Sequence, residues 1–166
     1  MNESIDKEIS LLAQSLAGLL INQGKTVAVA ESCTGGWLAK ILTDLSGSST
    51  WFLGGVVSYS NDAKRNVLHV KKACLEQFGA VSQEVAEQMA DGVKKAFNSS
   101  ISVSITGIAG PSGGTVDKPV GLVWFAVTTL KGDVVSMTKT YTGSRQQVRQ
   151  QALLTALELL IDNLEK

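Results

Sequence analysis

The sequence is poor in the residues that most often bind metals or act as bases. It has one histidine, His69, and two cysteines, Cys33 and Cys74, among 166 residues. The cysteines lack C-x-x-C spacing and have no histidine beside them, so we expect no structural zinc. A catalytic triad that depends on histidine is not expected either. A hydrolytic site in this chain would need a base of another type.

The sequence also lacks an excess of either charge and any long apolar run. Its 15 Lys and Arg residues balance 15 Asp and Glu residues, whereas binding to a phosphate backbone relies on an excess of basic residues. The amino terminus is acidic and has no apolar h-region, and no run approaches the roughly eighteen apolar residues of a membrane span. We therefore expect a cytoplasmic protein with neither a nucleic-acid nor a membrane partner.

Apolar residues are plentiful, at 44% of the chain, and their spacing predicts the fold. We expect residues 1–166 to form a single domain. Periods of 3.6 and 2 residues indicate helices and strands that alternate and end in a hairpin and a helix. This order predicts an α/β fold, a three-layer α/β/α domain with a mixed, mostly parallel sheet. The predicted helices cover residues 3–23, 37–45, 61–68, 72–78, 82–97 and a last segment from 145, and the strands 26–30, 52–60, 101–106, 120–129 and 134–141.

The stretch V-A-V-A-E-S-C-T-G-G at residues 27–36 predicts a buried strand, a tight turn and the start of a helix. Ser32 lies in the turn, where the first backbone amides of a helix are free to bind an anion. A hydroxyl there can attack a carbonyl while amides hold the oxyanion. The same residues are also typical of an ordinary helix N-cap, with glycines that allow close packing.

A lysine lies at the start of the next predicted helix. Ser60 or Asn61 is its cap, and with Asn61 as cap Lys64 occupies the first turn, where the helix dipole repels a cation. One interpretation is a solvated surface lysine. The other is a base: burial and the helix start both lower a lysine pKa toward the value of about 7 or 8 that general-base catalysis needs.

A loop rich in glycine follows the strand over residues 101–106. It contains both prolines of the chain, which favours a shaped loop with amides for a polar or anionic ligand over a mobile connection. Further on, Ser144 and Gln147 have the spacing of a capping box. Arg145 and Arg149 lie four residues apart in the helix that follows, a spacing that suits either a phosphate site or two solvated charges.

Four ordered motifs resemble the CinA C-terminal domain family, and in particular its stand-alone bacterial nicotinamide-nucleotide amidohydrolases. They are A-E-S-C-T-G-G at 30–36, Y-S-N-x-x-K at 59–64, S-I-T-G-I-A-G-P-S-G-G at 104–114 and K-P-V-G at 118–121. The resemblance covers nearly the whole chain. It implies hydrolysis of the carboxamide of nicotinamide mononucleotide (NMN) to nicotinic acid mononucleotide and ammonia, in pyridine-nucleotide recycling, without a cofactor or metal.

The resemblance also implies roles for residues of this chain. Ser32 is the expected nucleophile, Lys64 the base and Tyr59 a relay or orienting group, and a lysine base suits a chain with one histidine. Cys33 is a rival nucleophile, although packing as a small apolar residue is the more common role. The residues expected to bind the substrate are Cys33, Thr34, Gly35, Asn61, Thr106, Gly107, Gly110, Gly113 and Arg145.

Two other functions stay open at this point. One is a nucleotide-binding or regulatory module of the same family without catalysis. The other is an interaction protein in DNA uptake or damage response, against which the balanced charge argues. The family further implies a homo-oligomer, most simply a dimer, and apolar residues near Trp51, Phe52 and Trp124 are candidates for its interface or for the core.

Overall fold

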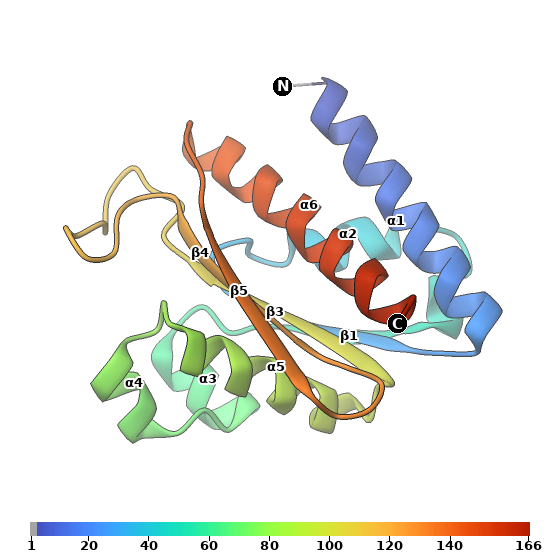
Figure 1. Ribbon diagram of the computed structural model, residues 1–166, viewed down its shortest axis with the longest axis horizontal. Coiled ribbons are helices and arrows are strands. Elements are labelled where there is room, and N and C mark those ends of the chain that lie inside the picture. The colour runs from blue at the N-terminus through green and yellow to red at the C-terminus, as the bar shows by residue number, and fades with distance from the viewer. Residues whose placement is uncertain (1–2) are drawn as a thin grey trace.

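The structure is a computed structural model that describes residues 3–166, and five strands form its single sheet (Figure 1). The strand order is β2-β1-β3-β4-β5. β1 pairs in parallel with β2 and β3, whereas β3 with β4 and β4 with β5 are antiparallel. β4 alone therefore runs against the other strands, as expected for a mixed, mostly parallel sheet. The strands are β1 (Val27–Glu31), β2 (Phe52–Val57), β3 (Ile101–Gly107), β4 (Leu122–Thr128) and β5 (Val134–Thr140).

Helices cover both faces of the sheet and make the three layers predicted from the sequence (Figure 1). On one face lie α1 (Glu3–Gln23), α2 (Trp37–Thr43) and α6 (Arg145–Leu164), and on the other α3 (Asn61–Leu68), α4 (Lys72–Phe78) and α5 (Gln83–Phe97). No helix within residues 3–166 combines the length and apolar character that a membrane crossing requires.

Each helical layer buries an apolar stripe against the sheet. Leu16 and Leu20 of α1 pack with Leu153 and Leu157 of α6 over the central strands. Each such side chain contributes about 1.5–3 kcal/mol when fully buried. The apolar cluster on the opposite face is smaller, and it includes Leu68 of α3 together with Val85, Met89 and Val93 of α5. The strands β1 and β3 between the two layers are buried almost throughout, which is why their residues other than Glu31 are apolar or small.

Most helix boundaries follow the predicted caps. The Ser144 hydroxyl accepts from the Gln147 amide, and the Gln147 side chain accepts from the Ser144 amide, so the capping box that opens α6 is confirmed. Ser60, the first of the two proposed caps, opens α3 by accepting from the Ala63 amide. The expected strand over residues 52–60 ends at Val57 because the chain turns there toward this cap.

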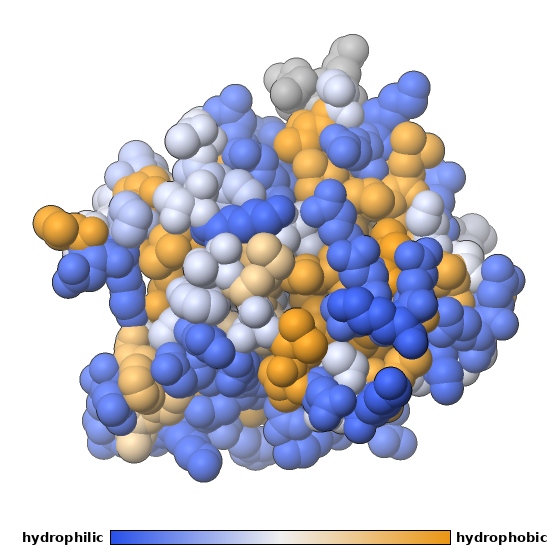
Figure 2. Space-filling model, viewed as in Figure 1, coloured by the Kyte–Doolittle hydropathy of each residue, from blue (hydrophilic) through white to orange (hydrophobic). Residues whose placement is uncertain are grey.

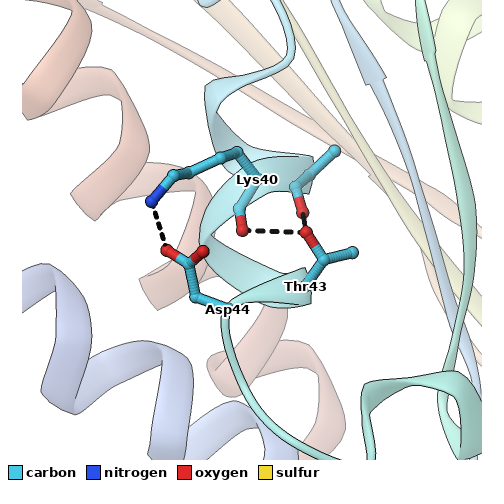
Figure 3. Close-up of polar contacts among 4 residues, drawn as sticks. Lys40, Thr43 and Asp44 are labelled. Atoms are coloured by element: carbon cyan, nitrogen blue, oxygen red, sulfur yellow. Dashed lines mark hydrogen bonds and ion pairs between the residues drawn. The ribbon is translucent and has the colours of Figure 1, made fainter.

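Helix α2 is short, and local contacts hold its last turn (Figure 3). The Lys40 amine lies 2.5 Å from the Asp44 carboxylate, and the Thr43 hydroxyl donates to the carbonyls of Ala39 and Lys40. A single turn of 3-10 helix, η1 (Ser48–Thr50), then leads to Trp51. Trp51 is 2% exposed and lies in the core, so it is not an interface residue on the surface of this chain.

Candidate active site

Ser32 is the first residue after β1, and hydrogen bonds of its own amide and carbonyl fix it at the start of a tight turn. Its amide donates to the Ile105 carbonyl of the neighbouring strand β3, and its carbonyl accepts from the Gly35 amide. The side chain is 9% exposed and reaches a pocket at the carboxyl ends of β1 and β3. Parallel strands place their following loops at one edge of the sheet, which is where α/β proteins commonly bind ligands.

Glu31, the residue before Ser32, caps α2 through its side chain. One carboxylate oxygen accepts from the amides of Gly36 and Leu38, and the other accepts from the amide of Ala39 at 2.8 Å. Glu31 is 1% exposed. Three amides at the start of α2 are therefore already bonded, and the expectation that the start of this helix is free for a ligand is wrong.

Sequence reasoning missed this role of Glu31. The signal was an acidic residue in an apolar strand, a few residues before a helix whose N-cap position has no capping side chain. The cap position is Gly36, with φ 88°, a value that favours glycine. The buried carboxylate replaces the missing cap because negative charge is favourable at a helix start. Among the residues described, the amides of Cys33 and Thr34 are the turn amides left without a hydrogen-bond partner.

Lys64 comes from the opposite layer and meets Ser32 inside the protein. Its Nζ lies 3.0 Å from the Ser32 hydroxyl oxygen and 2.6 Å from the Ser58 carbonyl oxygen. Lys64 is 1% exposed, so the solvated surface lysine considered from the sequence is not what the structure has. Because Ser60 is the N-cap, Lys64 lies at the fourth helical position, one residue further in than the alternative cap predicted.

Burial sets the protonation of the groups beside Ser32. It lowers the pKa of Lys64 to about 8, an effect that the charge of a Cys33 thiolate would oppose. No carboxylate lies within ion-pair distance of this amine in the described chain. Burial also raises the pKa of the Cys33 thiol to about 11. At neutral pH the thiol is therefore protonated, which makes Cys33 a poor nucleophile, whereas roughly a tenth of Lys64 is neutral at pH 7.

The pocket beside Ser32 has a volume of about 280 Å³, near the lower end of the range for small-molecule sites. Most of the residues predicted from the sequence line it: Ser32, Cys33, Tyr59, Lys64, Thr106, Gly107, Gly110, Gly113 and Arg145. Thr34, Gly35 and Asn61 are not among the lining residues. Thr34 is fully buried behind the turn, Gly35 faces Arg149, and Asn61 is the exposed first residue of α3.

Arg145 connects two walls of the pocket. Its guanidinium donates to the Gly110 carbonyl at 2.9 Å and to the Tyr59 hydroxyl at 3.0 Å. Tyr59 itself is 62% exposed, at the pocket mouth. Thr106 has a different role from the others, because its hydroxyl donates to the Ala80 carbonyl and so fixes the segment between α4 and α5 that forms another wall.

Arg149 does not join Arg145 in the pocket. It donates to the Thr34 carbonyl at 2.8 Å, and its guanidinium lies 5.0 Å from the centre of the Trp37 ring. The suggestion of a phosphate site shared by Arg145 and Arg149 is therefore wrong. Their four-residue spacing places both near the turn that contains Ser32, but Arg149 supports this turn from behind through a hydrogen bond and a cation–π contact.

The glycine-rich loop between β3 and β4 has a defined shape. Gly110 has φ 79°, and a Cβ there would lie 2.4 Å from a methyl carbon of Val120, so only glycine fits. The amides of Gly110 and Gly113 have no hydrogen-bond partner among residues 3–166. Lys118 ties the loop to the rest of the protein by donating from Nζ to the Phe78 carbonyl at the end of α4.

A doubly covered mixed sheet with a buried serine–lysine pair at the ends of its parallel strands defines an α/β protein with a candidate hydrolytic site. The model of the CinA C-terminal domain matches residues 9–164, and the chain belongs to this family. It is 47% identical over 155 residues to a protein of Escherichia coli K12 named nicotinamide-nucleotide amidohydrolase PncC, covering 93% of this chain and 94% of the relative.

In some relatives the matching region is only part of a longer protein. A CinA-like protein of Syntrophomonas wolfei is 53% identical over 149 residues, which are 90% of this chain and 36% of that protein. Among solved structures, the competence/damage inducible protein CihA of Agrobacterium tumefaciens has a TM-score of 0.93 and 42% identity, with 96% of each chain covered. The fold is therefore that of the CinA family.

Proposed function

We propose that this protein hydrolyses the carboxamide of NMN to nicotinic acid mononucleotide and ammonia. The observation that carries the proposal is the 3.0 Å distance between Lys64 Nζ and Ser32 Oγ inside the protein, at the wall of a pocket. The 47% identity to the E. coli amidohydrolase over nearly all of both chains supports the choice of substrate.

In the first step, neutral Lys64 takes the proton of the Ser32 hydroxyl as its oxygen attacks the carboxamide carbon. The Ser58 carbonyl accepts one N–H of the amine, which leaves the nitrogen lone pair to face the hydroxyl. The amide of Cys33, a residue that lines the pocket and whose amide has no other partner in the described chain, stabilises the oxyanion. One such donor typically contributes roughly 100- to 1,000-fold in rate.

In the second step, Lys64 returns its proton to the departing ammonia, and an ester between the acyl group and Ser32 remains. Water then attacks this ester with Lys64 again as the base, which releases the acid. The pocket wall supplies the contacts for the rest of the nucleotide. Arg145 and the free amides of the glycine loop hold the phosphate, and Tyr59 orients Arg145 through their 3.0 Å hydrogen bond.

The test is ammonia release from NMN by the purified protein, with Ser32→Ala and Lys64→Met beside it. Wild type should release ammonia, and each variant should lose at least about 1,000-fold in rate, as expected for removing a nucleophile or its base. Undiminished release by Ser32→Ala would contradict the proposal.

The second candidate is a nucleotide-binding module without catalysis. The unpartnered amides of the glycine loop and Arg145 favour binding of a phosphorylated ligand whether or not chemistry follows. Calorimetry separates the two functions: binding of NMN by wild type without formation of acid or ammonia would establish the module and exclude the enzyme.

We further propose that the protein acts in the cytoplasm in pyridine-nucleotide recycling. We also propose that it is a homodimer in which residues 1–166 of each subunit form a single domain. Apolar patches lie among polar residues on the face shown in Figure 2, and the edge strand β5 exposes Val134 and Val135. Light scattering of the purified protein tests the dimer, and a mass equal to one chain would exclude it.

A further inference from the structure

The pocket contains a single group that exchanges protons readily near neutral pH. Among the described residues that line it there is no histidine, aspartate or glutamate. Burial raises the pKa of the Cys33 thiol to about 11, and a guanidinium such as that of Arg145 has hydrogen-bond donors but no acceptor. The Tyr59 hydroxyl is bonded to Arg145 at 3.0 Å, whereas Lys64 touches Ser32, so Lys64 is the group placed to carry the proton transfers at the acyl carbon.

This has a consequence for the second half of the reaction described above. In serine hydrolases with a histidine base, one imidazole takes the proton of the serine and returns it to the leaving amine. Here the amine that protonates the departing ammonia is also the base for the incoming nucleophile. By microscopic reversibility, the position that ammonia leaves is a position from which a nitrogen nucleophile can attack, with its proton passing to Lys64.

We propose that the Ser32–Lys64 site transfers the acyl group of its substrate to small uncharged amines as well as to water. The inference rests on the proposed function, because it needs the acyl ester on Ser32. The amine nitrogen attacks the ester carbonyl, the new C–N bond forms, and the bond from carbon to Ser32 Oγ breaks. Lys64 takes a proton from the nitrogen and passes it to Oγ, so no oxidant or further reactant is needed.

Charge and size define the acceptor. The guanidinium of Arg145 lies at this pocket and repels a cationic amine, and a protonated amine has no lone pair with which to attack, so an uncharged amine is the one accepted. The space available is the one that ammonia vacates inside a pocket of about 280 Å³ that also holds the nucleotide. Hydroxylamine, which is small and uncharged at neutral pH, meets both conditions, and its product is a hydroxamate.

The experiment incubates wild type with NMN and increasing hydroxylamine at pH 8, measuring ammonia, acid and hydroxamate by mass spectrometry. We expect ammonia from every turnover, and an acid-to-hydroxamate ratio that halves each time hydroxylamine doubles. Samples without enzyme and with Ser32→Ala give the chemical background. In a second measurement, isotope-labelled ammonia added at alkaline pH should appear in the carboxamide of unreacted NMN.

The possible outcomes distinguish failure of the acyl-transfer proposal from failure of the proposed amidohydrolase function. Ammonia and acid without hydroxamate, at every hydroxylamine concentration, and without isotope exchange would overturn acyl transfer and leave the amidohydrolase intact. Absence of ammonia from wild type in the absence of hydroxylamine would overturn both. Hydroxamate formed equally by Ser32→Ala would also overturn the inference, because the transfer would not pass through the ester.

Discussion

The amine of Lys64 lies 3.0 Å from the hydroxyl oxygen of Ser32, although the two residues are 32 positions apart and belong to different layers of the fold. Ser32 follows the interior strand β1, and Lys64 comes from α3, which covers the opposite side of the sheet from α2. The fold thus brings a cation-forming group to a buried position where its charge is unfavourable, which has a cost in stability.

Replacing Lys64 by Met should stabilise the protein while abolishing activity. Burial lowers the pKa of Lys64 from 10.5 to about 8, and each unit is worth about 1.4 kcal/mol, so the gain below pH 8 is at most about 3.5 kcal/mol. Urea unfolding at pH 7 measures it, with the exposed Lys131→Met as control. A Lys64→Met variant less stable than wild type would contradict this account of the buried amine.

The same shift predicts how stability depends on pH. Between about pH 8 and 10.5 the unfolded chain holds a proton on Lys64 that the folded chain has released. The contribution of Lys64 to the free energy of unfolding therefore rises with pH across this window. The difference in free energy of unfolding between wild type and Lys64→Met, measured at matched pH values, isolates the contribution of Lys64. A difference that stays constant from pH 7 to 10.5 would show that the pKa is not lowered.

Cys33→Ala should remain active. The thiol lines the pocket, but its pKa is raised to about 11, so it is protonated at the pH of the reaction. We expect kcat/KM within about tenfold of wild type, a change of about 1.4 kcal/mol in activation free energy. Loss as large as that of Ser32→Ala would instead identify Cys33 as the nucleophile.

Much of the fold could be predicted from the sequence because periodicity and caps are local signals. The Ser144 capping box and the alternation of strands with helices are read from neighbouring residues. The carboxylate of Glu31 could not be placed in the same way, since its partners are amides five to eight residues ahead, around a turn. Its burial depends on the packing of two layers, which periodicity does not specify.

Many residues of the candidate site could be predicted because their sequence motifs lie directly after predicted strands, and parallel strands end at one edge of the sheet. Ser32, Tyr59, Lys64, Thr106 and Arg145 all line one pocket. Arg149 shows the limit of spacing arguments. Because Arg149 lies four residues after Arg145 in α6, the two residues are on the same side of the helix. The guanidinium of Arg149 nevertheless contacts the Thr34 carbonyl and the Trp37 ring and does not line the pocket. Only the tertiary contacts distinguish a binding residue from a supporting one.

Glu31→Gln should destabilise the protein and slow catalysis. An amide offers one acceptor oxygen where the carboxylate offers two to the amides of Gly36, Leu38 and Ala39. Leaving such buried donors without partners costs about 1–3 kcal/mol. Urea unfolding measures the loss, with the exposed Glu76→Gln as a matched control. Because the turn that carries Ser32 loosens, kcat should fall more than KM rises. Wild-type stability of Glu31→Gln would refute the capping role.

Lys118→Met should weaken substrate binding without changing the chemical step. Lys118 is remote from Ser32 in the chain and ties the glycine loop to α4 through the Phe78 carbonyl. Without this hydrogen bond the loop samples more conformations, so KM should rise by about tenfold while kcat is retained. Lys131→Met, in the β4–β5 turn, is the control and should leave both constants unchanged. A fall in kcat at unchanged KM would show that the loop takes part in catalysis instead.

The most direct test of the Ser32–Lys64 pair is the pH dependence of kcat/KM for NMN hydrolysis by wild type and Lys64→Arg. In the proposed mechanism the neutral amine is the active form, and its pKa is lowered to about 8, so wild-type activity should rise with pH and level off above that value. Arginine keeps the positive charge and cannot release it, so Lys64→Arg should lose at least about 1,000-fold and show no such rise. A Lys64→Arg enzyme with wild-type activity and the same pH profile would contradict the mechanism.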